Sequence, residues 1–195
     1  SPDYRKAFIV DLNTDFFRFF DNTTHGFYVS LRPRWRVNDK FTISHRFNIK
    51  RDLSSFGYVN DSLDINDEPV IIFGRRDITD ITNTFQSSFI FNNHSSLNLR
   101  LRHYWIKGVY DQFYDLNTEG YLEENNYDKL EDFNYNAFNI DMSYSWFFAP
   151  GSELSLVWKN AIYTYDENGA ELKYFDNVKN TLKNPSDNSF SIKIL

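Results

Sequence analysis

Three arginines stand at alternate positions of one short segment: Arg32, Arg34 and Arg36. In an extended strand alternate side chains leave the same face, so successive guanidinium groups start about 6.6 Å apart along the strand. Arg46 and Lys50 fall on the same side of the next segment. Arginine binds carboxylate and phosphate groups through paired hydrogen bonds. This pattern therefore favours anion binding, or ion pairs that join one strand to another.

Other reactive side chains do not form a recognisable site. The chain has no cysteine, and none of its four histidines lies within metal-ligand spacing of another. His45 and His103 fall on apolar faces, so we expect them to pack rather than to bind a metal. No nucleophile elbow or glycine-rich phosphate loop occurs, and the pair Glu123-Glu124 has no scaffold. The acidic run 60–69 lacks the spacing of a calcium loop. We predict no enzyme, metal or cofactor.

The elements that hold these residues are predicted by alternation. Apolar and polar residues alternate in about eight segments, which is the pattern of β-strands with one apolar and one polar face. The segments are approximately 6–20, 27–37, 41–50, 75–91, 97–113, 134–148, 153–165 and 188–195. We expect a bulge within 15–20, where the alternation breaks. Helix is expected only around 116–131 or 170–183.

The connections between these segments alternate in length. Short turns at 38–39, 92–95 and 149–151 alternate with long polar connections at about 52–74, 114–133 and 166–187. An up-and-down sheet would gather the short turns at one end, as outer-membrane barrels do. We predict one all-β domain over 1–195. It is an antiparallel up-and-down meander of about eight long strands, forming an outer-membrane β-barrel or the C-terminal part of a larger one.

In such a barrel the apolar faces would meet lipid and the polar faces would line the lumen. The lumen-facing basic residues that we predict are Arg32, Arg34, Arg36, Arg46, Lys50, Arg100, Arg102 and Lys159. The aromatic residues that we predict at the membrane interface are Trp35, Trp105, Trp146 and Trp158. The segments 52–68 and 114–132 hold 12 acidic residues and one lysine, which places the acids apart from the basic strands. The net charge of −6 argues against a nucleic-acid partner.

Two stretches resemble a known family. "FGRRDITDITNTFQSSFIFNNHSSLNLRLRHYW" (73–105) and "FNIDMSYSWFFAPGSELSLVWKN" (138–160), together with the final "NSFSIKIL", resemble the C-terminal region of a family of Gram-negative outer-membrane proteins. Members carry an N-terminal β-sandwich of the family-9 carbohydrate-binding type, followed by a β-barrel of undetermined function. The sandwich is absent here, and members usually continue past the last strand. The resemblance therefore implies a fragment of a larger barrel in a Gram-negative outer membrane.

Two functions are left open by the sequence. The first is a barrel in the outer-membrane bilayer that passes or captures a solute through its basic lumen. The solute would be anionic or derived from a glycan, and the arginines could also hold an acidic plug or partner protein. The alternative is a soluble or surface-exposed β-domain that binds carbohydrate or a protein partner through aromatic-rich loops. A barrel would need detergent for extraction and a soluble domain would not.

Overall fold

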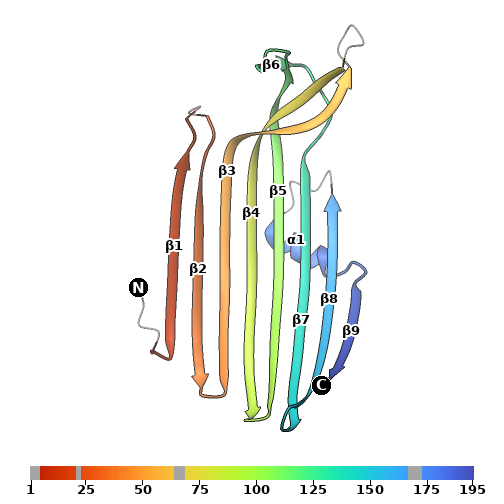
Figure 1. Cartoon of the computed structure of the whole chain (residues 1–195). Coiled ribbons are helices and arrows are strands. Elements are labelled where there is room, and N and C mark those ends of the chain that lie inside the picture. The colour runs from red at the N-terminus through yellow and green to blue at the C-terminus, as the bar shows by residue number, and fades with distance from the viewer. Residues whose placement is uncertain (1–4, 21–22, 64–68, 167–172) are drawn as a thin grey trace.

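The computed structural model describes residues 5–20, 23–63, 69–166 and 173–195. These residues form one antiparallel sheet and one short helix, α1 (Tyr174–Thr181) (Figure 1). The strands are β1 (Phe8–Arg18), β2 (His25–Asn38), β3 (Phe41–Leu63), β4 (Pro69–Asn92), β5 (Ser95–Leu116), β6 (Leu122–Asn125), β7 (Phe133–Ala149), β8 (Ser152–Asp166) and β9 (Asp187–Ile194). No helix in the described part of the chain is long and apolar enough to cross a membrane.

The strands follow one another across the sheet in chain order. The order is β1-β2-β3-β4-β5-β7-β8-β9, and the short β6 pairs with the end of β5. The turns β2–β3, β4–β5 and β7–β8 lie together at the lower end in Figure 1, whereas β6 in the β5–β7 connection lies at the upper end and α1 in the β8–β9 connection lies at mid-height. This confirms the all-β meander with eight long strands and its sorted connections. Among the described residues β1 pairs only with β2 and β9 only with β8, so the sheet is open.

Several predicted boundaries are wrong. Much of the expected loop 52–74 belongs to β3 and β4, which run on to Leu63 and start at Pro69. Alternation did not reveal these extensions, because register shifts at Asp52/Ser55 and Tyr58/Asn60 interrupt it in β3 and because residues 70–73 of β4 are all apolar. The bulge expected within 15–20 is also absent from the described strand, since β1 pairs with β2 without a shift through Arg18. The connection around 116–131 holds β6 rather than a helix, whereas α1 lies in the second expected region.

The sheet has two faces of opposite chemistry. We call the side that carries Val29, Ile49, Ile81 and Leu99 the apolar face, and the opposite side the polar face. Cross-strand pairing puts these apolar side chains level with further apolar ones on neighbouring strands. The lower half of the apolar face is therefore a largely apolar band that crosses all eight long strands and is interrupted by a few polar side chains, among them Asn83 and His103. Register preserves this arrangement, because a slip of one residue would turn every side chain to the other side.

In the described part of the chain, no second layer of sheet covers the apolar band. Buried apolar side chains in the described part of the chain are few: Ile9, Ile72, Trp105, Tyr114, Ala137 and Ile162. The accessible surface is 13118 Å², whereas a compact monomer of this mass would expose about 9,700 Å². Of the described elements, α1 is the one that packs over the sheet, against β5, β7 and β8. Soluble domains usually bury such a face between two layers.

Candidate functional site

The polar face brings the predicted basic residues together in three adjacent rows, which we call the basic rows. Each row runs across the sheet through cross-strand neighbours. The upper row consists of Asp11, Arg32, Arg46, Thr84, Arg102, Asn139, Ala161 and Asp187. The middle row consists of Ile9, Arg34, Ser44, Gln86, Arg100, Asp141, Lys159 and Ser189. The lower row consists of Arg36, Thr42, Ser88, Asn98, Ser143, Val157 and Ser191.

A hollow of about 590 Å³ lies over the middle and lower rows. Its polar-face lining comes from five strands and consists of Thr42, Ser44, Gln86, Ser88, Asn98, Arg100, Asp141, Ser143, Val157 and Lys159. A hollow that spans five adjacent strands indicates that the sheet curves toward the polar side. The exposure of side chains on the edge strand β1 is consistent with curvature toward the polar side. Ile9, on the polar face, is 5% exposed, whereas Phe8, on the apolar face, is 58% exposed. The hollow has the size of a small-molecule site.

Cations outnumber carboxylates in the basic rows. The rows hold seven arginine or lysine residues and three aspartates, a formal charge of +4. Arg100 lies 3.4 Å from Asp141, and both side chains are partly exposed, so this pair contributes at most about 1 kcal/mol. The described structure gives no ion pair to Arg32, Arg36, Arg46, Arg102 or Lys159. These cations remain available to an anion.

The expected separation of acids from basic strands is only partly right. Asp11 and Asp141 lie within the basic rows, and Asp52 and Asp80 lie higher on the same face. Lys50, the highest of the predicted basic residues, is held 2.7 Å from Asp52 on its own strand and stands level with Asp80. The counts over 52–68 and 114–132 did not include Asp11, Asp80 and Asp141, which are single residues within strands, and they included Asp52 as a loop residue although it lies in β3. Lys50 is therefore neutralised locally, unlike the cations below it.

Tyrosines gather on the polar face directly above the basic rows. Tyr104 and Tyr135 lie on neighbouring strands with ring centroids 6.1 Å apart. Tyr163 is level with Tyr104 across the small Ala137, and Tyr163 itself is exposed. An exposed aromatic ring with a hydroxyl can stack on a sugar ring and hydrogen-bond to it. These tyrosines were not predicted as a group, although the alternation within 134–148 and 153–165 assigns two of them to the polar side.

The four predicted interface tryptophans all lie on the apolar face, but in different settings. Trp35 and Trp146 are exposed near the lower end. Trp158 lies in mid-band, where it stacks on Phe190 at 6.3 Å and donates a hydrogen bond to Asn188. Trp105 departs from the prediction, since it is 5% exposed and donates to Asn134 at 2.6 Å beneath α1. Only the first two therefore have the exposure that an interfacial position needs.

Both histidines that were expected to pack do so, through polar partners. The ring of His45 lies 3.0 Å from the Asn83 side-chain oxygen. Asn83 donates to the Tyr174 hydroxyl at 2.6 Å, and Nδ1 of the buried His103 lies 3.0 Å from the same hydroxyl. Burial raises the pKa of Tyr174, which keeps its hydroxyl protonated and able to donate to His103. These residues form a polar patch on the apolar face, below α1.

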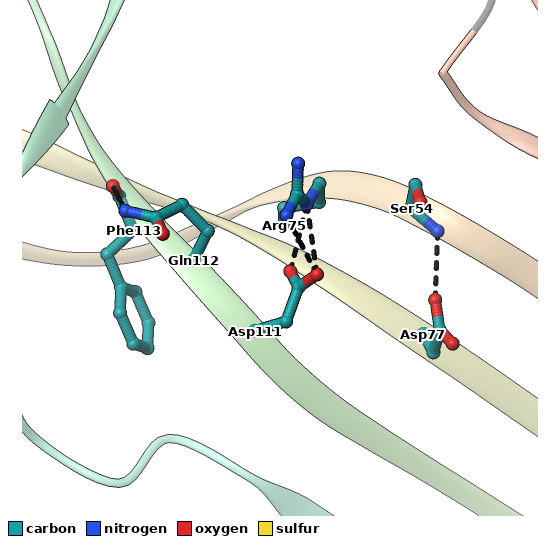
Figure 2. A network of polar contacts seen from close by, with 6 residues as sticks. All are labelled: Ser54, Arg75, Asp77, Asp111, Gln112 and Phe113. Atoms are coloured by element: carbon teal, nitrogen blue, oxygen red, sulfur yellow. Dashed lines mark hydrogen bonds and ion pairs between the residues drawn. The ribbon is translucent and has the colours of Figure 1, made fainter.

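The upper ends of β3, β4 and β5 carry a separate network of charged residues (Figure 2). Arg75 donates two hydrogen bonds of 2.9 Å to the Asp111 carboxylate, and the Ser54 backbone N–H donates to Asp77 at 2.9 Å. The pairing register shifts beside both contacts, so they brace bulged strands. The described residues contain no group of three His, Cys, Asp or Glu that could hold a metal. Residues 64–68 of the acidic run 60–69 lie outside the described structure.

Comparison with known proteins places the chain in a family. The chain belongs to the family described as Domain of unknown function (DUF5916), whose model matches residues 1–195. No curated protein and no solved structure matches the chain. This assignment agrees with one part of the resemblance described above, namely that the chain belongs to a family of unknown function. The family description gives no function, and the two faces of the sheet are the features that bear on it.

Proposed function

We propose that this member of the family is an outer-membrane β-barrel domain that captures or passes an anionic, sugar-like solute. In this proposal the apolar band contacts the lipid and the basic rows line the lumen. One observation carries the proposal: the hollowed face is basic and polar, and the opposite face is an apolar band over which the described residues place no second sheet layer. A soluble β-domain would place its apolar face inside, as the core between packed layers.

The height of the apolar band supports a membrane environment. On β5 the band runs from Leu97 to Trp105, which is about 26 Å along the strand. A tilt of about 40° reduces this to roughly 20 Å along the membrane normal, close to the outward apolar band of about 25 Å in outer-membrane barrels. The band ends at the same level on β3 and β4. The next residue above Ile49 on the same face of β3 is Arg51, and the next above Ile81 on β4 is Thr79. Strands that continue above it would stand in water.

The nature of the solute follows from the polar face. Arginine and lysine side chains without an ion pair attract carboxylate, sulfate or phosphate groups. Above them the exposed Tyr163 and the partly buried Tyr104 and Tyr135 provide rings for stacking on a sugar. A solute that combines both features is an acidic saccharide, whose charged groups would lie on the basic rows and whose rings would lie on the tyrosines. Low-dielectric walls around such a lumen would strengthen its attraction for anions.

Single-channel conductance of the full-length protein in planar bilayers tests this proposal. We expect anion selectivity, and we expect the ratio of anion to cation permeability to fall roughly twofold or more in the Arg34→Ser/Arg36→Ser variant. Arg75→Ser is the matched control, because it removes an arginine outside the basic rows and should leave selectivity unchanged. A cation-selective wild type would contradict the anion path. A silent wild type that conducts after the double substitution would instead assign Arg34 and Arg36 to a plug or to struts across the lumen.

Extraction tests the membrane part of the proposal independently of any solute. The full-length protein should remain with the membrane fraction until detergent is added, because its apolar band would otherwise meet water. Recovery as a monodisperse protein in buffer without detergent would overturn the proposed membrane location and favour the soluble β-domain.

A further inference from the structure

The apolar face carries one element that a plain lipid-facing sheet does not need, the helix α1. It crosses β5, β7 and β8 and is held by polar contacts. Asn134 donates to the Asn177 side-chain oxygen at 2.6 Å, and the hydroxyls of Thr164 and Thr181 lie 3.2 Å apart. Asn177 and Thr181 are 2% and 1% exposed. The buried amides and hydroxyls satisfy one another, so α1 is fixed to the sheet rather than resting on it.

The helix lies where the apolar band ends. Register places one charged and polar row directly above the row that contains Ile49, Ile81 and Trp105. We call it the border row; from β3 to β8 it consists of Arg51, Thr79, Lys107, Asn134 and Asp166, whereas Phe16 and Phe27 stand at this level on β1 and β2. Since α1 contacts Asn134 of this row and Trp105 of the row below, it spans the change from apolar to charged surface.

The side of α1 that turns away from the sheet is amphipathic. Phe175 is 81% exposed and Leu182 is 49% exposed. Lys179 lies between them on the same flank, because positions i, i+4 and i+7 share one side of a helix. Lys183 follows in the next turn. Exposed aromatic and aliphatic side chains beside lysines are typical of helices that lie in the plane of a membrane interface.

Charge at this level is complementary to an anionic surface. The charged residues of the border row and of α1 with its flanking residues are Arg51, Lys107, Asp166, Lys173, Asp176, Lys179 and Lys183. Five cations against two carboxylates give a formal charge of +3. Basic residues near a membrane surface attract anionic lipid, each contributing about 1 kcal/mol. Lysine can also extend its charged end to a phosphate while its methylene chain stays among apolar groups.

We propose that α1 is a fixed interfacial helix that docks on anionic lipid headgroups at the upper border of the apolar band. Phe175 and Leu182 enter the boundary between headgroups and acyl chains, and Lys179 and Lys183 pair with lipid phosphates. This inference rests on the proposed membrane location. It also gives a reason for the polar residues beneath α1, because the buried His103, Asn134 and Asn136 would be costly in contact with lipid and each contacts Tyr174 or Asn177 of the helix.

Nitroxide labelling tests this inference cleanly, because the chain has no native cysteine. Phe175→Cys and Leu182→Cys are labelled in the full-length protein, reconstituted into phosphatidylcholine vesicles with one third phosphatidylglycerol. Collision with oxygen reports lipid, and collision with a water-soluble nickel chelate reports water. We expect labels at 175 and 182 to collide mainly with oxygen, at a shallower depth than a label on Leu99→Cys in mid-band. Asn180→Cys, on the opposite flank of α1, should collide mainly with nickel.

The controls separate this inference from the proposal beneath it. If the label at 99 lies in lipid while those at 175 and 182 are as accessible to nickel as the label at 180, the interfacial helix is wrong and the membrane location stands. A water-accessible label at 99 would overturn the membrane location itself. For the lipid charge, Lys179→Gln/Lys183→Gln should lower the enrichment of phosphatidylglycerol around the protein at least twofold. Unchanged enrichment would contradict the pairing of these lysines with lipid phosphates.

Discussion

The lower and upper halves of β3, β4 and β5 follow different rules, although they belong to the same strands. Below Asp52 the pairing of β3 with β4 is continuous from Phe41, and apolar and polar residues alternate. Above it the register shifts between Asp52 and Ser55, again between Tyr58 and Asn60, and the β4–β5 pairing shifts at Arg75/Arg76. A bulge turns later side chains to the other face. Pairing of β3 with β4 is thus continuous in the lower half, where one face is apolar and the other polar. It is interrupted by bulges in the upper half, where the two faces do not differ in this way.

Glycines mark the same division. Gly74 and Gly108 lie in the upper half, each beneath a large aromatic ring of the neighbouring strand. A Cβ at Gly74 would lie 2.3 Å from the Tyr110 ring, and one at Gly108 would lie 2.3 Å from the Phe133 ring. Arg76 in turn lies over both rings, at 5.4 Å and 5.9 Å from their centroids. The upper half is therefore held by specific side-chain packing, whereas the lower half depends on its surroundings.

The largest difference is expected from a charge placed in each half of β5. Leu99→Arg should destabilise the reconstituted protein by about 2–4 kcal/mol, the cost of a cation at the middle of the lipid face of a barrel. Val109→Arg puts the same side chain on the same face of the upper half and should cost less than about 1 kcal/mol. Urea unfolding in vesicles, followed by tryptophan fluorescence, measures both. Equal costs would remove the distinction between the halves.

A smaller effect is expected from filling the space beneath an aromatic ring. Gly74→Ala should cost about 1–3 kcal/mol, because the Tyr110 ring must leave its position over the glycine. The same unfolding measurement applies, and Tyr110→Ala in the Gly74→Ala background should restore part of the loss. If the single substitution is neutral, packing over glycine does not hold the upper half together.

The charged contact of the upper half should matter less still. Replacing Arg75 by Gln removes three hydrogen bonds to Asp111, yet both side chains are partly exposed. We expect a loss of at most about 1 kcal/mol that shrinks further in high salt. Asp111→Asn is the matched partner variant. A loss above this range, independent of salt, would indicate that the contact locks the bulged strands.

The smallest effect on stability is expected in the hollow. Arg100→Leu should change the free energy of unfolding by less than about 0.5 kcal/mol, because its pair with Asp141 is partly exposed and substitutions in a lumen mainly tune selectivity. Its position directly beside Leu99 makes the two variants a test of which face meets lipid. A large cost for Arg100→Leu would place this arginine in a structural ion pair instead.

Alternation predicted the lower half of the sheet well because each strand there carries its own signal. Leu97, Leu99 and Leu101 against Asn98, Arg100 and Arg102 define the faces of β5 without knowledge of any other strand. The positions of the short turns also predicted that the strands pair in chain order as a meander. That Arg46 and Arg102 share one row depends on the register of β3 with β4 and of β4 with β5, which the alternation within a single strand does not specify.

The contacts of α1 could not be read in the same way. His103, Asn134 and Asn136 interrupt an apolar face, and in the sequence they are isolated exceptions to the alternation. Their partners Tyr174 and Asn177 lie at least 38 positions further along the chain, in a segment with too few residues for a helical period to stand out. Only the folded structure shows that these three polar residues all contact α1.

The meander has a consequence for how the chain folds. Each long strand pairs only with strands close to it in the sequence, so the sheet can grow by adding one strand at a time. Closing a short turn costs little entropy, and proteins rich in local contacts fold fast for their size. The connection between Asp166 and Asp187 is one of the longest, and it contains α1. We therefore expect β9 to join late, after the helix has found its place on β5, β7 and β8.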